Sequence, residues 1–345
     1  MSRVVILGAG VMGSAFSLPL ADAGCEVALV GTHLDRALIE GVRKDARHPK
    51  LNALLPQGVR AFHHEDLATV VDAGADLVVL GVSSAGVEWA IDRLQPLLSA
   101  VKPPILMLTK GLIDESGRLG IFPTRVEAAL GCPVGGVGGP CIAGELAVRR
   151  HTGTVVSFDD PARIARVLAM LDAPYYHPRA STDLVGVEAC AALKNFMALG
   201  IGAALGQLDV SEPVDNKAQM HNHAAGLFNQ ALLELDHING ALGGDPATVR
   251  GLAGTGDLYV TVQGGRNSRM GRLLGAGWRY GRAKAERMAE DTVEGAELAL
   301  SVGGTMLAMI GRGELDAARL PLSRAILRAV RDDEPFVVPW NDFAR

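Results

Sequence analysis

One lysine lies in the middle of the apolar segment VEACAALKNFMALGIG, at residues 187–202. The segment has the composition of a buried helix, and the neighbours of Lys194 at helical spacing are apolar or nearly so: Cys190, Ala191, Met197 and Ala198. Lys194 is therefore not part of a charged helix surface. It could reach solvent along its own methylene chain, or pair with a carboxylate for structural reasons alone. A desolvated lysine also has a lowered pKa and exchanges protons near neutral pH, which makes Lys194 a candidate general acid or base.

A glycine-rich turn near the start of the chain has the pattern of a dinucleotide-binding loop. The apolar strand RVVIL is followed at once by GAGVMG, then by a segment of helical length and a second strand, CEVALV. In this context Gly8 permits the turn, Gly10 lets the backbone approach a pyrophosphate, and Gly13 lets the helix pack on the strand. Val11 and Met12 open the helix, whose N-terminus faces the phosphates. A glycine turn without a ligand is the alternative, and the strand–turn–helix context favours the nucleotide.

The end of the second strand leaves the choice between NAD and NADP open. An NAD-specific site usually has an acidic residue there to bind the ribose diol. This sequence has Gly31, Thr32 and His33 at that place, with Asp35 slightly later. His33 and Arg36 could pair with the 2′-phosphate of NADP, or they could be ordinary solvated loop residues. The expected cofactor is therefore NAD or NADP.

Further strands are predicted near residues 75–82, 104–109, 132–137 and 153–158, with helical stretches between several of them. This pattern predicts an open α/β sheet with mostly parallel strands. Ligands of such sheets bind beyond the carboxyl ends of the strands. Lys110 directly follows one of these strands, so we expect its charge at the mouth of the cleft, with a plain surface cation as the alternative.

The pattern changes after residue 180, where strand signals nearly vanish and helical periodicity continues to about residue 330. We therefore predict two domains. Residues 1–183 form a Rossmann-type dinucleotide-binding domain with a mostly parallel sheet, and residues 184–345 form an all-helical substrate-binding domain. The helix that carries Lys194 begins the second domain.

Composition narrows the class of protein. The 345 residues are enough for two domains, and a net charge of −5 spread along the chain gives no basic surface for nucleic acid. Four cysteines without C-x-x-C spacing indicate a reducing compartment and no structural metal. We see no signal peptide and no apolar run of membrane-spanning length. We therefore expect a cytoplasmic enzyme without a nucleic-acid or membrane partner, and we expect it to be a homodimer.

Seven motifs together carry a resemblance to a known family. They are GAGVMG at 8–13, RHPKLNALLPQGV at 47–59, TKGL at 109–112, GGPCIAGE at 138–145, GVEACAALKN at 186–195, GLAGTGDLYVT at 251–261 and GGRN at 264–267. In this order, and over most of its length, the chain resembles the NAD(P)-dependent sn-glycerol-3-phosphate dehydrogenase family. The resemblance implies a Rossmann domain, a helical substrate domain, and the interconversion of glycerol 3-phosphate and dihydroxyacetone phosphate.

The resemblance also implies roles for residues of the second domain. Lys194 matches the general acid/base, and Asp257 matches the residue that holds and orients it. Asn195 and Thr261 match residues that contact the substrate. Independently, Asp257 lies in the glycine-rich segment AGTGDL, and a carboxylate near Lys194 would offset the cost of burying its charge.

Further matches concern the phosphate and the cofactor. Arg266 and Asn267 resemble the family's phosphate-binding pair, and a guanidinium fork suits phosphate better than a lysine does. Arg266 is also assigned to the cofactor site, together with Lys110, Ala143 and Glu294. Lys110 matches the second lysine of the cleft and is a further catalytic candidate. A solvated turn at GGRN and a helix-surface charge at Glu294 are the competing interpretations.

One region departs from the family pattern. After the lysine helix the family usually has a segment like NAKAALITRGL, whereas this chain has LDVSEPVDNKAQMHNHAAGLFNQAL at 208–232. Asn216, Lys217 and Ala218 match in part, but the basic TRG is absent. His221 and His223 do not share a helix face, so no metal site is predicted.

The departure at 208–232 leaves the substrate open. The main alternative is a dehydrogenase of a longer phosphorylated polyol or keto-sugar. A nucleotide-sensing protein without turnover is a second alternative, and the pair Lys194 and Asp257 argues against it because a sensor needs no proton carrier. An opine or ketopantoate-type reductase is disfavoured by GGRN, which indicates a phosphate.

Overall fold

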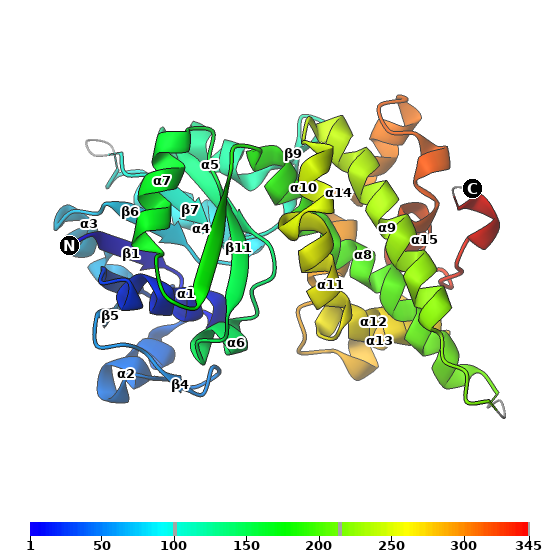
Figure 1. The fold of residues 1–345 in the computed structure, drawn as a ribbon, viewed down its shortest axis with the longest axis horizontal. Helices are drawn as coiled ribbons and strands as arrows, with labels where there is room; N and C mark the ends of the chain where they lie inside the picture. The colour runs from blue at the N-terminus through cyan, green and yellow to red at the C-terminus, as the bar shows by residue number, and fades with distance from the viewer. Residues whose placement is uncertain (99–101, 213–215, 344–345) are drawn as a thin grey trace. The chain divides into compact units, whose positions relative to one another are not determined.

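The computed structural model describes residues 1–98, 102–212 and 216–343, and the described chain divides into two compact units (Figure 1). The first unit contains Met1–Lys110 and Phe122–Val187, and the second contains Gly111–Ile121 and Glu188–Arg345. The chain therefore passes between the units after residues 110, 121 and 187.

The first unit is built on an eight-stranded sheet in the order β12-β11-β10-β7-β6-β1-β2-β5. The strands are β1 (Arg3–Leu7), β2 (Glu26–Val30), β5 (Val59–Phe62), β6 (Leu77–Leu80), β7 (Ile105–Met107), β10 (Val134–Gly138), β11 (Thr152–Ser157) and β12 (Tyr176–Ser181). Within the described residues all pairings of this sheet are parallel except that of β10 with β11. The prediction of a mostly parallel α/β sheet is confirmed.

The central strands are buried because helices cover the sheet. Residues 4–7 of β1 and residues 77–80 of β6 have no exposed surface, as expected for parallel strands that are packed on both faces. The helices are α1 (Val11–Asp22), α2 (Arg36–Asp45), α3 (Leu67–Asp72), α4 (Val87–Leu94), α5 (Phe122–Leu130), α6 (Ala143–Ala147) and α7 (Pro161–Met170). Two short 3-10 turns, η1 (His64–Asp66) and η2 (Ser84–Gly86), and the small hairpin of β3 (Arg47–His48) with β4 (Ala53–Leu54) complete the unit.

The sheet order determines where a ligand can bind. The chain builds outward from β1 to β2 and β5 on one side, and then to β6, β7 and β10 on the other. The strand order thus reverses beside β1, and ligands of open α/β sheets bind at such a point, beyond the carboxyl ends of the strands. The segment GAGVMG follows β1 at this place.

In the part of the second unit that the structure describes, the chain is helical apart from one hairpin. The α-helices are α8 (Leu184–Val210), α9 (His221–Leu242), α10 (Pro246–Arg250), α11 (Asp257–Val262), α12 (Arg266–Gly275), α13 (Tyr280–Arg287), α14 (Glu294–Gly311) and α15 (Pro321–Arg331). Helix α8 begins in the first unit. The π-helix η3 (Leu252–Gly256) precedes α11, and η4 (Ala317–Arg319) and η5 (Trp340–Asp342) are 3-10 turns. This confirms the all-helical prediction for the region from α8 to α15. The division into a domain of residues 1–183 and a domain of residues 184–345 stays a prediction.

A hairpin from the N-terminal part of the sequence packs on the helical unit. Strands β8 (Leu112–Glu115) and β9 (Arg118–Ile121) contact α14. Thr305 of α14 donates a hydrogen bond to Asp114, and Arg312 donates to the carbonyl oxygen of Gly117 at 2.6 Å. Lys110 therefore lies one residue before a segment that belongs to the second unit.

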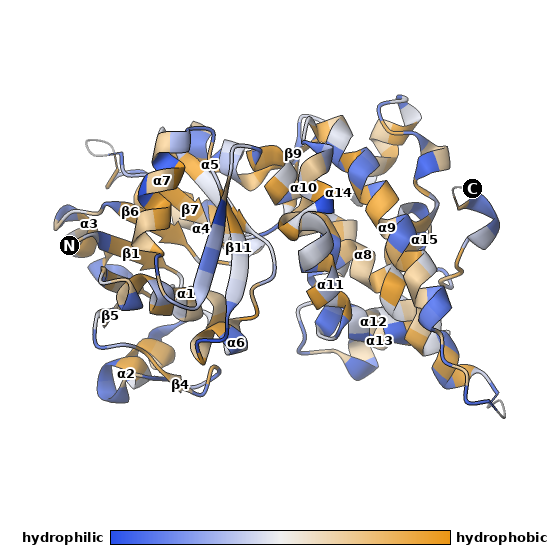
Figure 2. Ribbon diagram, viewed as in Figure 1, coloured by the Kyte–Doolittle hydropathy of each residue, from blue (hydrophilic) through white to orange (hydrophobic). Residues whose placement is uncertain are grey.

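Helix α8 is the core of the helical unit. Figure 2 shows apolar residues along it. It is long and apolar enough to cross a membrane by composition, but 89% of its most apolar window is buried inside the protein. Its apolar character is therefore that of a core helix.

Glycines bring α8 and α12 into backbone contact. A Cβ atom added at Gly206 of α8 would lie 1.9 Å from the carbonyl oxygen of Arg272, and one added at Gly275 of α12 would lie 2.0 Å from that of Ala203. Such distances leave no room for a side chain on either helix. These contacts fix the C-terminal half of α12 relative to α8, which carries Lys194. A Cβ at Gly202 of α8 would lie 2.6 Å from the carbonyl oxygen of Ser268, so the start of α12, which carries Arg266 and Asn267, also lies close to α8.

Candidate active site

The side chain of Lys194 forms a buried ion pair. Lys194 is 8% exposed in the middle of α8, and its Nζ donates a hydrogen bond to Oδ1 of Asp257, which is 1% exposed. Burying either charge alone would cost several kcal/mol, and the opposite charge beside it offsets much of that cost. The segment that looked like a plain apolar helix thus holds a paired ammonium group.

A π-helical turn brings Asp257 to this position. The segment Leu252–Gly256 forms η3, and Asp257 is the first residue of α11. The turn is tight, since a Cβ at Gly254 would lie 2.2 Å from the carbonyl oxygen of Val249. Thr261 Oγ1 donates to the main-chain oxygen of Asp257 at 2.7 Å, one turn along α11. Local π-turns of this kind occur frequently at functional sites.

Asn267 connects three helices next to the lysine. Its Nδ2 donates to Oδ1 of Asn195 on α8 at 2.9 Å, and its Oδ1 accepts from the amide of Gly295 on α14 at 2.9 Å. Asn195 and Asn267 are both buried. The helices approach closely here, because a Cβ at Gly295 would lie 2.2 Å from the carbonyl oxygen of Asn195. Asn195 lies directly after Lys194 in α8, so the amide pair lies one residue along the helix from the ion pair.

Arg266 and Glu294 form the exposed part of the cluster. Arg266 Nη2 donates to Glu294 Oε1 at 2.9 Å, and their side chains are 45% and 47% exposed. An exposed ion pair contributes little stability, so the guanidinium can exchange its carboxylate partner for another anion at low cost. The second unit thus brings together Lys194, Asn195, Asp257, Thr261, Arg266, Asn267 and Glu294 through the contacts described.

The glycine loop of the first unit has the shape of a nucleotide cradle. Gly8 has φ +114°, and a Cβ there would lie 2.6 Å from the backbone of Gly81. A Cβ at Gly13 would lie 2.1 Å from the carbonyl oxygen of Gly8, whereas one at Gly10 would meet nothing within 4 Å. Gly8 and Gly13 are therefore needed for close packing, while Gly10 borders open space. Helix α1 begins there without a side-chain cap, which leaves its first amide groups for a phosphate.

A pocket adjoins this loop. Gly8, Gly10, Thr32, His33, Val82 and Trp89 are among the residues that line it. The rings of His33 and Trp89 lie 5.4 Å apart between centroids, tilted by 54°. A concave site with aromatic walls beside a phosphate cradle suits a purine nucleoside. The residues present therefore fit the cofactor that the sequence analysis predicts.

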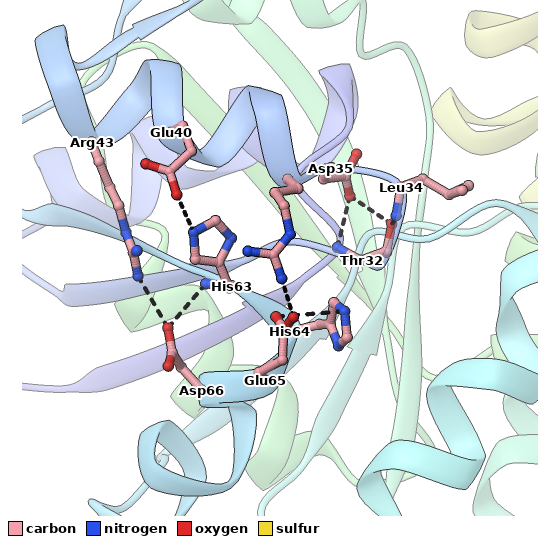
Figure 3. A network of polar contacts seen from close by, with 10 residues as sticks. Thr32, Leu34, Asp35, Glu40, Arg43, His63, His64, Glu65 and Asp66 are labelled. Carbon is pink, nitrogen blue, oxygen red and sulfur yellow. Dashed lines mark hydrogen bonds and ion pairs between the residues drawn. The ribbon is translucent and has the colours of Figure 1, made fainter.

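A network of charged residues borders the pocket (Figure 3). Asp35 accepts hydrogen bonds from the main-chain amide and the hydroxyl of Thr32, both at 2.8 Å. Arg36 pairs with Glu65, a residue of η1, which follows β5. Glu65 was not among the predicted site residues, because it lies 29 residues from Arg36 in the sequence. The signal that could have pointed to Glu65 is that it follows β5, the strand that pairs with β2.

Lys110 and Ala143 follow other strands of the sheet. Lys110 comes shortly after β7, and Thr109 beside it donates to the carbonyl oxygen of Val82 at 2.7 Å. Ala143 is the first residue of α6, which follows β10. Because β1, β6, β7 and β10 are parallel neighbours, the segments after them lie at one edge of the sheet.

Together the sheet, the glycine loop and the helical unit define a Rossmann-type dinucleotide-binding protein with an added helical domain. Models of the N-terminal and C-terminal parts of NAD-dependent glycerol-3-phosphate dehydrogenase match residues 3–164 and 183–336. The chain belongs to the NAD(P)-dependent glycerol-3-phosphate dehydrogenase family. The resemblance inferred from the seven motifs is confirmed.

Individual relatives agree with this assignment. The chain is 35% identical over 301 residues to the NADP(+)-dependent glycerol-3-phosphate dehydrogenase of Archaeoglobus fulgidus, covering 86% of this chain and 87% of the relative. The crystal structure of glycerol-3-phosphate dehydrogenase from Coxiella burnetii matches with a TM-score of 0.80 at 25% identity, over 99% of this chain and 97% of the other. The enzyme from Saccharomyces cerevisiae shares the fold, with a TM-score of 0.82 at 20% identity over 97% of each chain.

Proposed function

We propose that the protein catalyses the NAD(P)-dependent interconversion of glycerol 3-phosphate and dihydroxyacetone phosphate, with Lys194 as the general acid/base. The family assignment supports the reaction. The observation that carries the catalytic role is the buried ion pair of Lys194 with Asp257. Such a pair holds an amine where it can exchange protons without bulk water.

The cofactor, when bound, takes up or supplies the hydride. The chain's own residues then handle the proton at the substrate oxygen. In the oxidation, Lys194 Nζ accepts the proton that leaves the C2 hydroxyl group, and in the reduction it returns a proton to the carbonyl oxygen. Asp257 holds Lys194 in place and supports its charged form.

We assign the substrate phosphate to Arg266 and Asn267. The support is their place at the start of α12, where Asn267 is fixed by Asn195 and by the amide of Gly295. Arg266 would release Glu294 when it binds phosphate, and a guanidinium offers phosphate two parallel hydrogen bonds. Asn195 and Thr261 then lie beside the reacting part of the substrate.

We assign the dinucleotide to Gly8, Gly10, Val11, Met12 and Gly13. His33 and Arg36 border the adenosine side, and Lys110, Ala143, Arg266 and Glu294 complete the cofactor assignment. The catalytic candidacy of Lys110 rests on the resemblance alone.

The cellular location, the oligomeric state and the metabolic role of the protein are also part of the proposal. We propose that the protein is a cytoplasmic homodimer, as expected from the sequence, and that it serves glycerophospholipid and carbohydrate metabolism. A longer phosphorylated polyol or keto-sugar is the second candidate substrate. The observation that favours it is the unusual segment 208–232, which contains the end of α8 and the first half of α9.

An absorbance assay at 340 nm tests the proposal. Dihydroxyacetone phosphate and longer keto-phosphates are compared with NADH and with NADPH. We expect the fastest turnover with dihydroxyacetone phosphate. Preference for a longer keto-phosphate would establish the second candidate, and binding of cofactor without turnover of any substrate would indicate a nucleotide sensor.

A further inference from the structure

One histidine of the first unit contacts the glycine loop from a distant part of the chain. His48 lies in β3 and has no exposed surface. Its Nε2 lies 3.2 Å from the carbonyl oxygen of Ala9, and its Nδ1 accepts a hydrogen bond from the amide of Leu51 at 3.1 Å. Because Nδ1 accepts, the ring proton sits on Nε2, and His48 donates to Ala9. The small β3–β4 hairpin therefore ties a neutral imidazole to the loop.

A second buried side chain donates to the same oxygen. Ser14, in the first turn of α1, has no exposed surface, and its Oγ donates to the carbonyl oxygen of Ala9 at 2.9 Å. A carbonyl oxygen has two lone pairs. The two donors satisfy both of them, which fixes the orientation of the Ala9 carbonyl group.

The orientation of this carbonyl group determines where the next amide points. A trans peptide group is planar, and its C=O and N–H bonds point in opposite directions. His48 and Ser14 hold the Ala9 oxygen on the buried side, so the amide of Gly10 is directed to the other side. Gly10 borders open space, where an added Cβ would meet nothing within 4 Å.

We propose that His48 and Ser14 are positioning residues that lock the Ala9–Gly10 peptide so that the Gly10 amide faces the pyrophosphate of the cofactor. The inference rests on the proposed function only in taking the ligand to be a dinucleotide. Without the two donors the peptide group can rotate, and a rotated peptide presents a carbonyl lone pair to the negatively charged phosphates. The loop would then repel the group that it is built to bind.

The chemistry of the site keeps His48 neutral. Burial lowers the pKa of His48 below its ordinary value of 6.5, and Lys50 lowers it further, while Asp35 and the hydrogen bond with Ala9 oppose the shift. A protonated ring would lose its acceptor for the Leu51 amide. The neutral form is the one that makes both hydrogen bonds.

Calorimetric titration with ADP and with NADPH tests the proposal, because neither measurement requires turnover. We expect Ser14→Ala and His48→Leu each to raise the Kd for ADP by about tenfold, the value of one hydrogen bond to a charged group. His48→Gln places an amide N–H near the position of Nε2 and should restore most of the affinity.

Ser17→Ala is the matched control. Ser17 is equally buried on α1 and also donates to a main-chain oxygen, but its hydrogen bond goes to Ser14, at 2.6 Å, and not to Ala9. It should lower thermal stability to a similar degree as Ser14→Ala and leave the Kd within about twofold. Should His48→Leu not fold, Ser14→Ala against Ser17→Ala still decides the question.

Two results would distinguish a failure of the positioning proposal from a failure of the proposed function. An unchanged Kd for ADP in Ser14→Ala, with stability lowered as in Ser17→Ala, would overturn the positioning role while leaving the dehydrogenase assignment intact. Failure of the unmodified protein to bind either ADP or NADPH would contradict the proposed function and this inference together.

Discussion

At the scale of single residues, the site contains one buried ion pair and one exposed ion pair, and the two behave differently. Lys194 and Asp257 are both buried, and each depends on the other because an unpaired buried charge is expensive. Arg266 and Glu294 are each about half exposed, and water screens their attraction. The first pair is therefore fixed in place, while the second can open for an incoming anion.

Removal of the Arg266 guanidinium tests the phosphate assignment. We expect Arg266→Ala to raise the KM for dihydroxyacetone phosphate by roughly 30-fold to several thousand-fold, since a charge-assisted contact is lost. Steady-state kinetics at saturating cofactor gives this value.

Arg269→Ala is the control on the same helix. Arg269 is an exposed arginine of α12 paired with Asp291 at 3.3 Å, and its loss should leave the KM nearly unchanged. If Arg266→Ala instead weakened cofactor binding and left the substrate KM alone, Arg266 would belong to the nucleotide site only.

At the scale of elements, the candidate active site of the second unit depends on close helix contacts. The C-terminal end of α12 is held against α8 by Gly206 and Gly275, and its start by Gly202, where an added Cβ would lie 2.6 Å from the carbonyl oxygen of Ser268. The start of α14 is held against α8 by Gly295. Asn267 can bridge to Asn195 only because these backbones approach so closely. Helix packing in this unit is therefore part of how the site is assembled.

Gly275→Ala should disturb this packing. The added methyl group would meet the carbonyl oxygen of Ala203, and overpacking of this kind costs about 1–3 kcal/mol. We expect the midpoint of thermal unfolding to fall by roughly 3–10 °C.

Gly240→Ala is the control, because Gly240 lies in α9 and an added Cβ there meets nothing within 4 Å. That variant should be neutral or slightly more stable, since alanine is the better helix former. Equal effects of the two substitutions would contradict the packing account.

A buried carboxylate caps α15 from another helix. Glu234 of α9 has no exposed surface and accepts from the amides of Leu322 and Ser323, both at 2.6 Å. These are orphan donors of the first turn of α15, and a negative charge there also favours the helix dipole. Glu234→Ala should lower the free energy of unfolding by about 2–5 kcal/mol, measured by urea denaturation of the whole protein. A loss below about 0.5 kcal/mol, the range of ordinary surface substitutions, would show that the cap is not needed.

At the scale of the whole molecule, three histidines predict how stability depends on pH. Burial lowers the pKa of His48, His223 and His237 below 6.5. The folded protein therefore binds fewer protons on these rings than the unfolded chain does. Stability is full above pH 6.5 and is lost as the pH falls from there through the lowered pKa values.

Thermal unfolding between pH 7.5 and pH 5 measures this effect. We expect the unfolding midpoint to decrease steadily below pH 6.5, and His237→Gln to make the decrease smaller. His237 Nε2 accepts from the amide of Asp316 at 2.9 Å, which the amide oxygen of glutamine can also do. A midpoint that rises on acidification across this range would contradict the assignment of neutral rings at these three histidines.

Local sequence patterns predicted the helices, strands and turns better than they predicted the contacts between them. The periodicity around Lys194 predicted α8, and the spacing of Gly8, Gly10 and Gly13 predicted the loop after β1. Local patterns sufficed there because helices and tight turns are set by neighbouring residues. The parallel sheet followed from the alternation of strands and helices.

Local sequence patterns could not predict the contacts that assemble the sites. Lys194 and Asp257 are 63 residues apart, and their pairing was suggested by the family resemblance and supported by the need of a buried lysine for a carboxylate. His48 and Ala9 are 39 residues apart, and nothing local distinguishes His48 from a solvated histidine. The hairpin of β8 and β9 packs on the helical unit although it follows Lys110 directly in sequence. Long-range contacts of this kind depend on the finished fold.

The central claim is that Lys194 moves the proton in the oxidation and reduction of the substrate. The most direct test is the rate of NADPH oxidation by Lys194→Met with dihydroxyacetone phosphate, together with the Kd for NADPH. We predict a loss of roughly 10²–10⁴-fold or more in kcat, with cofactor affinity within about twofold of the unmodified protein, and partial recovery of Lys194→Ala by added ethylamine. Turnover close to that of the unmodified protein in Lys194→Met would contradict the account.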